Sequence, residues 1–109
     1  MGHDISGFNK AGEEIAYARF SMGNYNAIIL YDLLDATKFY AGVSGSGGSS
    51  TFSKQQIEKA INAYNQLFNI QHSPSESNSL PWDQKQIHHF ILNCLNTAKK
   101  EGSVQVYFG

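Results

Sequence analysis

The sequence predicts an α+β fold: a small three-stranded sheet, antiparallel or mixed, with about three helices packed on one of its faces. Two short segments near the N-terminus alternate between apolar and polar residues on either side of a turn, as a β-hairpin does. Three central segments carry apolar residues at helical spacing, and a last segment alternates again. The predicted order is therefore β-β-α-α-α-β, in a single domain over residues 1–109, because a chain of this length builds one core.

A hairpin is expected first, from residues 3–8 (HDISGF) and 14–22 (EIAYARFSM), with a turn that contains asparagine and glycine between them. Pairing Asn9 with Glu14 fixes the register. The pairs predicted on one face are Phe8–Ile15, Ser6–Tyr17 and Asp4–Arg19. The expected core face holds Ile5, Gly7, Ala16, Ala18 and Phe20. Its small residues would let a helix approach the sheet closely.

Residues 24–38 are predicted to form the first helix, because their apolar side chains surround nearly the whole helix at a period of about 3.6 residues. These side chains are Ile28, Ile29, Leu30, Leu33 and Leu34. A buried strand over residues 27–31 is the alternative, which the β-branched pair at positions 28 and 29 favours.

Two later helices share one start signal, a capping residue followed three positions later by glutamine: Ser53 with Gln56, and Asp83 with Gln86. The first helix is expected to bury Ile57, Ala60, Ile61, Tyr64 and Phe68. The second is expected to bury Ile87, Phe90, Ile91, Cys94, Leu95 and Ala98. Residues 70–80 are predicted to be a polar loop between them.

The last predicted element is a half-buried strand at residues 103–108 (SVQVYF), after a helix end capped by Gly102. Val104, Val106 and Phe108 fall on one side of this strand. Gln105 and Tyr107 fall on the other. The strand must pair with the N-terminal hairpin, which is the only other sheet that the sequence predicts.

Composition limits the partners. Charged residues make up 16% of the chain and the net charge is -1, so no electrostatic attraction favours nucleic acid or an anionic membrane, and we expect neither as a partner. No apolar run approaches the roughly 20 residues that span a bilayer, and no signal peptide is visible. With a single cysteine, the expectation is a cytoplasmic protein without a cofactor.

Residues 39–51 (FYAGVSGSGGSST) are predicted to be a surface loop, either a linker or a mobile lid. Gly45, Gly47 and Gly48 come close to a dinucleotide-binding fingerprint, but a serine replaces the third glycine and no strand is predicted before them. The alternative is an anion- or ligand-binding loop that acts with the helix start at Ser53. If the segment is only a linker, alanine at Gly45 or Gly47 should be nearly silent.

The histidines and the cysteine form no motif. Zinc would need ligands from distant positions, such as His3, Asp4 and His88, so no metal site is predicted. Cys94 lies in an apolar stripe, where a thiol behaves as a small hydrophobe, and no catalytic residue is predicted.

One face of the predicted sheet is polar and not covered by the helices. We call it the open face; it consists of Asp4, Ser6, Tyr17, Arg19, Gln105 and Tyr107. Arg19 is the only arginine in the chain. One interpretation is an ordinary cross-strand ion pair between Asp4 and Arg19; the other is a recognition surface, in which the guanidinium binds a carboxylate or phosphate between two tyrosines.

The leading hypothesis is a non-enzymatic binding or regulatory protein that meets a protein partner, or a second copy of itself in a homodimer, through the open face or an edge strand. The alternative is a small enzyme or anion-ligand binder. Its site would lie between the glycine loop, the helix start at Ser53 and a polar group such as His3, Asp4 or Tyr40.

Overall fold

The computed structural model describes residues 2–21, 24–42, 44–67 and 82–109, the last range with the side chains of its first two residues left aside. The elements are β1 (Gly2–Phe8), β2 (Glu14–Ser21), α1 (Tyr25–Leu33), the 3-10 helix η1 (Thr37–Phe39), β3 (Gly48–Ser53), α2 (Lys54–Leu67), α4 (Trp82–Glu101) and β4 (Ser103–Phe108). The predicted polar loop at residues 70–80, and Phe68, lie outside the described residues.

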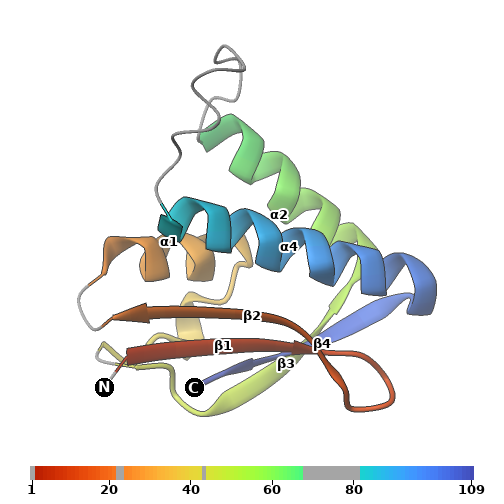
Figure 1. Ribbon diagram of the computed structural model, residues 1–109, viewed down its shortest axis with the longest axis horizontal. Helices are drawn as coiled ribbons and strands as arrows, with labels where there is room; N and C mark the ends of the chain where they lie inside the picture. The colour runs from red at the N-terminus through yellow and green to blue at the C-terminus, as the bar shows by residue number, and fades with distance from the viewer. Residues whose placement is uncertain (1, 22–23, 43, 68–81) are drawn as a thin grey trace.

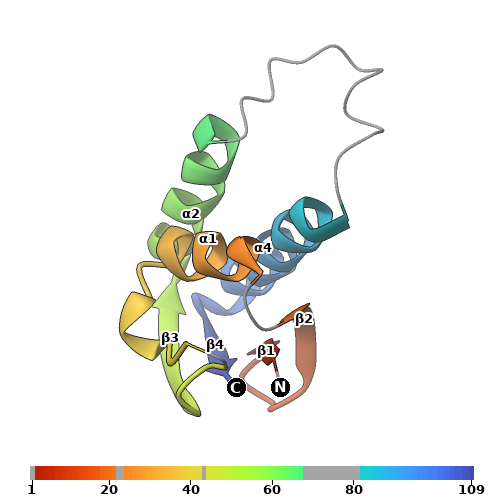
Figure 2. The ribbon, with the colours of Figure 1, turned by 90° about the vertical axis from the view of Figure 1, so that its left-hand side faces the viewer.

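The strands form one antiparallel sheet in the order β2-β1-β4-β3, and α1, α2 and α4 lie together on one of its faces (Figures 1 and 2). The α+β class and the helices on one face are confirmed. The prediction of three strands is wrong, because the described sheet has four. The order β-β-α-α-α-β is wrong at the same point, since β3 stands between the first two of these helices.

β3 occupies part of the segment that the sequence predicts to be a loop. Only Phe52 of this strand is buried, so its sequence lacks the alternation that marks a half-buried strand. Gly48 has no side chain on the core side, and the ring of Phe39 fills that space, 2.8 Å from where a Cβ would stand. The strand forms by pairing its backbone with β4.

The hairpin has the predicted register over most of its length. Asp4 pairs with Arg19 and Ser6 with Tyr17, and the small and apolar partners between them face the helices. The predicted pair Phe8–Ile15 is wrong, because a bulge between Gly7 and Phe8 places Phe8 opposite Glu14.

The first helix is shorter than predicted. Asn24 caps α1 by accepting a hydrogen bond from the N–H of Asn26 at 2.9 Å, which rules out the alternative strand over residues 27–31. The helix stops because Asp35 adopts a left-handed backbone with φ 54°, and η1 follows it. Ile28, one of the apolar side chains that surround this helix, is 39% exposed.

The two predicted capping boxes have different outcomes. Ser53 and Gln56 form theirs: Ser53 Oγ accepts from the N–H of Gln56 at 3.2 Å, and Gln56 Oε1 accepts from the N–H of Ser53 at 2.7 Å. The second box is wrong, because α4 already begins at Trp82 and Gln86 bonds to β2 instead.

The core lies between the sheet and the helices, and all of the residues predicted to be buried by α4 are buried. On α2, Ile57, Ala60 and Tyr64 are buried and Ile61 is partly buried. Gly7 allows the predicted close approach, since a Cβ there would stand 3.0 Å from Cys94 Sγ. After α4, Gly102 takes a left-handed backbone with φ 87° and donates to Ala98 O at 2.7 Å, as predicted for its cap.

β4 confirms its predicted alternation, with Val104, Val106 and Phe108 buried and Gln105 and Tyr107 exposed. It pairs with β1, as predicted, and on its other side with β3. β4 is therefore a central strand, and its exposed residues lie in the middle of the sheet.

Candidate functional site

The structure brings the six residues of the open face together on the side of the sheet away from the helices. Asp4 pairs with Arg19, while Ser6 pairs with both Tyr17 and Tyr107. Gln105 lies two residues before Tyr107 on β4, opposite Phe8. Three strands thus supply one continuous polar surface, which alternation and hairpin register suffice to predict.

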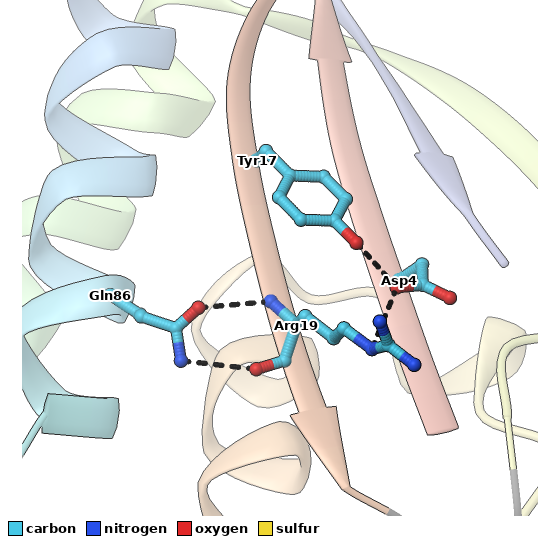
Figure 3. Close-up of polar contacts among 4 residues, drawn as sticks. All are labelled: Asp4, Tyr17, Arg19 and Gln86. Atoms are coloured by element: carbon cyan, nitrogen blue, oxygen red, sulfur yellow. Dashed lines mark hydrogen bonds and ion pairs between the residues drawn. The ribbon is translucent and has the colours of Figure 1, made fainter. Parts of the chain in front are cut away.

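The Arg19 side chain forms an ion pair with Asp4, whose carboxylate also accepts a hydrogen bond from Tyr17 (Figure 3). The hydroxyl of Tyr17 donates to Asp4 Oδ1 at 2.6 Å, and Arg19 Nε lies 3.5 Å from the same oxygen. The hydrogen bond to Asp4 raises the pKa of Tyr17 above its ordinary value, so the hydroxyl remains a donor at neutral pH. The side chains of Arg19 and Asp4 are 70% and 46% exposed.

Asp4 is the one described partner of the Arg19 guanidinium. Within the part of the chain that the structure describes, no other hydrogen bond or ion pair involves the Arg19 side chain. An exposed pair of this kind stabilises a fold by only about 0.2–1 kcal/mol. The Arg19 side chain is 70% exposed, so its guanidinium can present N–H donors to a partner.

Gln86 of α4 binds the backbone of Arg19, a contact that the sequence did not predict. Gln86 Oε1 accepts from the N–H of Arg19 and Gln86 Nε2 donates to its carbonyl, both at 3.0 Å (Figure 3). The side chain amide thus bonds to β2 as a neighbouring strand would. The only sequence signal was the glutamine itself, which fits a capping box equally well.

Tyr107 and Gln105 extend the site across β4. Tyr107 is 41% exposed, and Gln105 Nε2 donates to Ser49 Oγ of β3 at 3.3 Å. Beside Gln105 the surface is hollowed at the hairpin end of the sheet, where a cavity of about 290 Å³ is lined by Phe8, Asn9, Lys10, Gly12, Thr51, Ser103, Val104 and Gln105. The open face therefore combines flat aromatic contacts with a hollow of mixed polar and apolar lining.

The N–H groups of residues 45–47, at the centre of the glycine segment, are not free to bind an anion. The N–H of Gly45 donates to Gly109 O at 2.8 Å, that of Ser46 to Phe39 O at 2.9 Å, and that of Gly47 to Phe108 O at 2.8 Å. A phosphate cradle needs such groups unpaired and pointing at the ligand. These glycines instead join the segment to the end of β4.

The expectation that alanine at Gly45 would be nearly silent is overturned by packing. A Cβ at Gly45 would stand 2.5 Å from Phe108 O and 2.8 Å from the Tyr31 hydroxyl. Gly47 has a left-handed backbone with φ 86°, which strains any other residue. Both positions are therefore structural.

Ser53 lies at the opposite end of β3 from these glycines. The six residues Gly48–Ser53 are extended, which separates the two ends by about 17 Å. Ser53 is also occupied in the cap of α2. The glycine segment and the helix start are thus not brought together into one pocket.

His3 and Tyr40, two of the polar groups considered for the alternative site, do meet, but in the interior. His3 is 1% exposed and stacks on Tyr40 with ring centroids 5.1 Å apart. Its Nε2 lies 3.1 Å from Gly42 O and its Nδ1 3.1 Å from the Tyr31 hydroxyl. A carbonyl only accepts, so Nε2 carries the proton and Nδ1 accepts from Tyr31.

This interior cluster is fully paired and serves the fold. Burial raises the pKa of Tyr31 to about 12, so its hydroxyl keeps the proton that it donates. The described side chains leave no buried nitrogen or oxygen without a hydrogen bond. His3 therefore ties the glycine segment to α1 and β1.

The candidate metal ligands are not brought together. His3 faces the helices while Asp4, its neighbour on β1, belongs to the open face. Over the described ranges no three histidine, cysteine or acidic side chains gather as metal ligands would. Burial raises the pKa of Cys94 to about 12, which makes its thiol a poor nucleophile at neutral pH.

Two further observations bear on function. Among the described helices, none has the length and apolar character that crossing a bilayer requires. Comparison with protein-family models, with curated proteins and with solved structures found no match in any of the three.

Proposed function

We propose that this chain is a non-enzymatic binding protein that recognises a protein partner on the open face of its sheet, with Arg19 receiving a carboxylate of that partner. The observation that carries the proposal is the exposed Arg19, which forms an ion pair with Asp4 and whose side chain has no other partner among the described residues.

The chemistry of the site favours a carboxylate of a protein partner. A guanidinium presents two parallel N–H donors, which match the two oxygens of a carboxylate. Tyr17 and Tyr107, 51% and 41% exposed, supply flat contacts with an apolar body and a polar tip, the residue type that is enriched in protein interfaces. The net charge of -1 supports a protein rather than a nucleic acid partner.

The test places a photo-cross-linking amino acid at Tyr107 and compares capture in cells with and without Arg19→Ala. Gln66, on the exposed side of α2, is the matched position for the cross-linker. We expect one partner to be captured from position 107. The amount captured should fall about tenfold or more in Arg19→Ala, because a charge-assisted hydrogen bond is lost.

Lys99→Ala controls for the loss of one exposed positive charge. It should leave capture unchanged, and all variants should keep the melting temperature of the original protein, because Arg19 contributes little to the fold. Capture from position 66 but not from 107, or capture that persists in Arg19→Ala, would contradict the proposal.

A further inference from the structure

We propose that the outer edge of β3 is an interface between two copies of this chain, joined by antiparallel pairing of their β3 strands around a two-fold axis. This inference does not depend on the function proposed for the open face. It concerns main-chain groups at the edge of the sheet, whereas Arg19 lies on the opposite edge strand.

The two edges of the sheet differ in how far they are closed. At β2, Gln86 binds both the N–H and the carbonyl of Arg19, and the carbonyl of Ser21 accepts from the N–H of Asn24 at 3.0 Å. An edge strand whose backbone groups are bonded in this way cannot add a further strand there. The β2 edge is therefore closed at Arg19 and Ser21, beside α4, and the inference rests on the groups that the edge at β3 leaves open.

The register identifies the groups that point outward from β3. The N–H of Lys54 donates to Gly102 O at 3.3 Å, in line with the pairing of Phe52 with Val104 and Ser50 with Val106. In an antiparallel ladder the hydrogen-bonded residues alternate with residues whose N–H and carbonyl point away. The main-chain N–H and carbonyl groups that point away from β4 are therefore those of Ser49, Thr51 and Ser53.

Ser53 is already closed by Gln56, whose side chain accepts from its N–H at 2.7 Å. For the outward main-chain groups of Ser49 and Thr51, no partner is found among the described residues. These two residues thus form a short, open window in the edge.

The window is complementary to itself. In a two-fold antiparallel pair, Ser49 lies opposite Thr51 of the second copy, Thr51 lies opposite Ser49, and Ser50 meets its own counterpart at the axis. Each outward N–H then meets an outward carbonyl, and none of these groups is left over. A cyclic two-fold interface of this kind uses the same patch on both copies.

The side chains permit the pairing. Residues 39–53 contain no charged side chain, so no like charges meet when the segment faces its own copy. Ser49 and Thr51 are small, exposed and hydroxyl-bearing, and serine–threonine pairs across antiparallel strands are favourable. The edge lacks the lysine, proline or inward-pointing charge by which edge strands commonly avoid association.

The dimer would carry one continuous sheet in the order β2-β1-β4-β3-β3-β4-β1-β2, with both open faces on the same side. Two Arg19 side chains would then stand near opposite ends of a single surface. A partner with two acidic segments could engage both.

The test measures mass by sedimentation across a range from micromolar to millimolar protein. Thr51→Pro removes an N–H that the monomer does not use, so the fold tolerates it, as proline is tolerated on edge strands. Thr51→Val is the matched control, because it removes the hydroxyl and keeps the N–H. We expect the original protein and Thr51→Val to dimerise, and Thr51→Pro to weaken dimerisation about thirtyfold, since symmetry removes two hydrogen bonds.

A monomer at every concentration, or a dimer that Thr51→Pro leaves unchanged, would overturn the inference. Hydrogen exchange of the original protein provides a second test that needs no variant: the amides of Ser49 and Thr51 should be protected only at high concentration. If they exchange equally at low and high concentration, the inference is wrong. Arg19→Ala should still dimerise, which separates this result from the test of the open face.

Discussion

At the scale of single residues, the fold depends on close approaches that only the smallest side chains allow. Gly7 lies on β1 under α4, and the space above it is filled by atoms of both the helix and the neighbouring strand. The pattern of small residues on one hairpin face indicated this approach from the sequence, because such a face has little else to bury.

Gly7→Ala should therefore destabilise the protein by about 1–3 kcal/mol through overpacking. The new Cβ would stand 3.0 Å from Cys94 Sγ, 3.2 Å from Ala16 Cβ and 3.3 Å from Ile15 Cδ1. Urea denaturation measures the loss. In a Cys94→Ala background the cost should shrink, since the nearest atom is gone; additive effects of the two changes would show that the contact is unimportant.

A second residue-scale prediction concerns acid. Burial lowers the pKa of His88, and the charge of His89 lowers it further. The ring of His88 stacks on Tyr64 with centroids 5.2 Å apart. Between the lowered folded pKa and the unfolded value of 6.5, the unfolded chain binds more protons, so stability is full above that value and is lost as the pH falls below it.

The melting temperature should thus drop as the pH falls below about 6.5, and His88→Phe should flatten this dependence while it keeps the stacked ring. Scanning calorimetry across this range measures both. An unchanged slope in His88→Phe would assign the acid sensitivity to other groups.

At the scale of elements, α4 does more than cover the sheet, because Gln86 also closes the edge of β2. The sequence placed Gln86 in a capping box, since a glutamine three residues after an aspartate is compatible with one. An amide side chain bonds to any nearby N–H, and no local pattern says which one. Tertiary packing of α4 beside β2 decides it (Figure 1).

Gln86→Ala should cost about 1–2 kcal/mol, because the two hydrogen bonds to the Arg19 backbone are lost at a position where water partly replaces them. The amide of Arg19 should exchange faster with deuterium. Gln86→Glu is the informative comparison: it can still accept from the Arg19 N–H but cannot donate to the carbonyl. Protection of Arg19 that survives in Gln86→Ala would mean that other groups hold this edge.

β3 is the strand that the sequence did not predict. A strand is visible when its side chains alternate, and β3 contributes only Phe52 to the core. What holds β3 is the backbone of β4 and the ring of Phe39 over Gly48. Neither of these contacts produces an alternation of apolar and polar residues in the sequence of β3.

At the scale of the whole molecule, the sequence predicted the class, the hairpin, the helices and the open face, because each follows from local periodicity plus one pairing rule. The parts of the alternative anion site do not come together, because a strand that pairs with a distant segment lies between them. The glycine segment and Ser53 are near in sequence, but an extended strand holds them apart. Their proximity could only be judged once β3 was seen to form.

The position of β4 gives the chain a particular order of assembly during synthesis. Ribosomes release the N-terminal part first, so the hairpin, β3 and the helices all emerge before residues 103–108. Yet β4 is the strand that joins β1 to β3. Without β4, residues 48–53 have no strand to pair with, and β1 is paired only with β2. The four-stranded sheet can therefore form only after residues 103–108 have been synthesised, because β4 completes it.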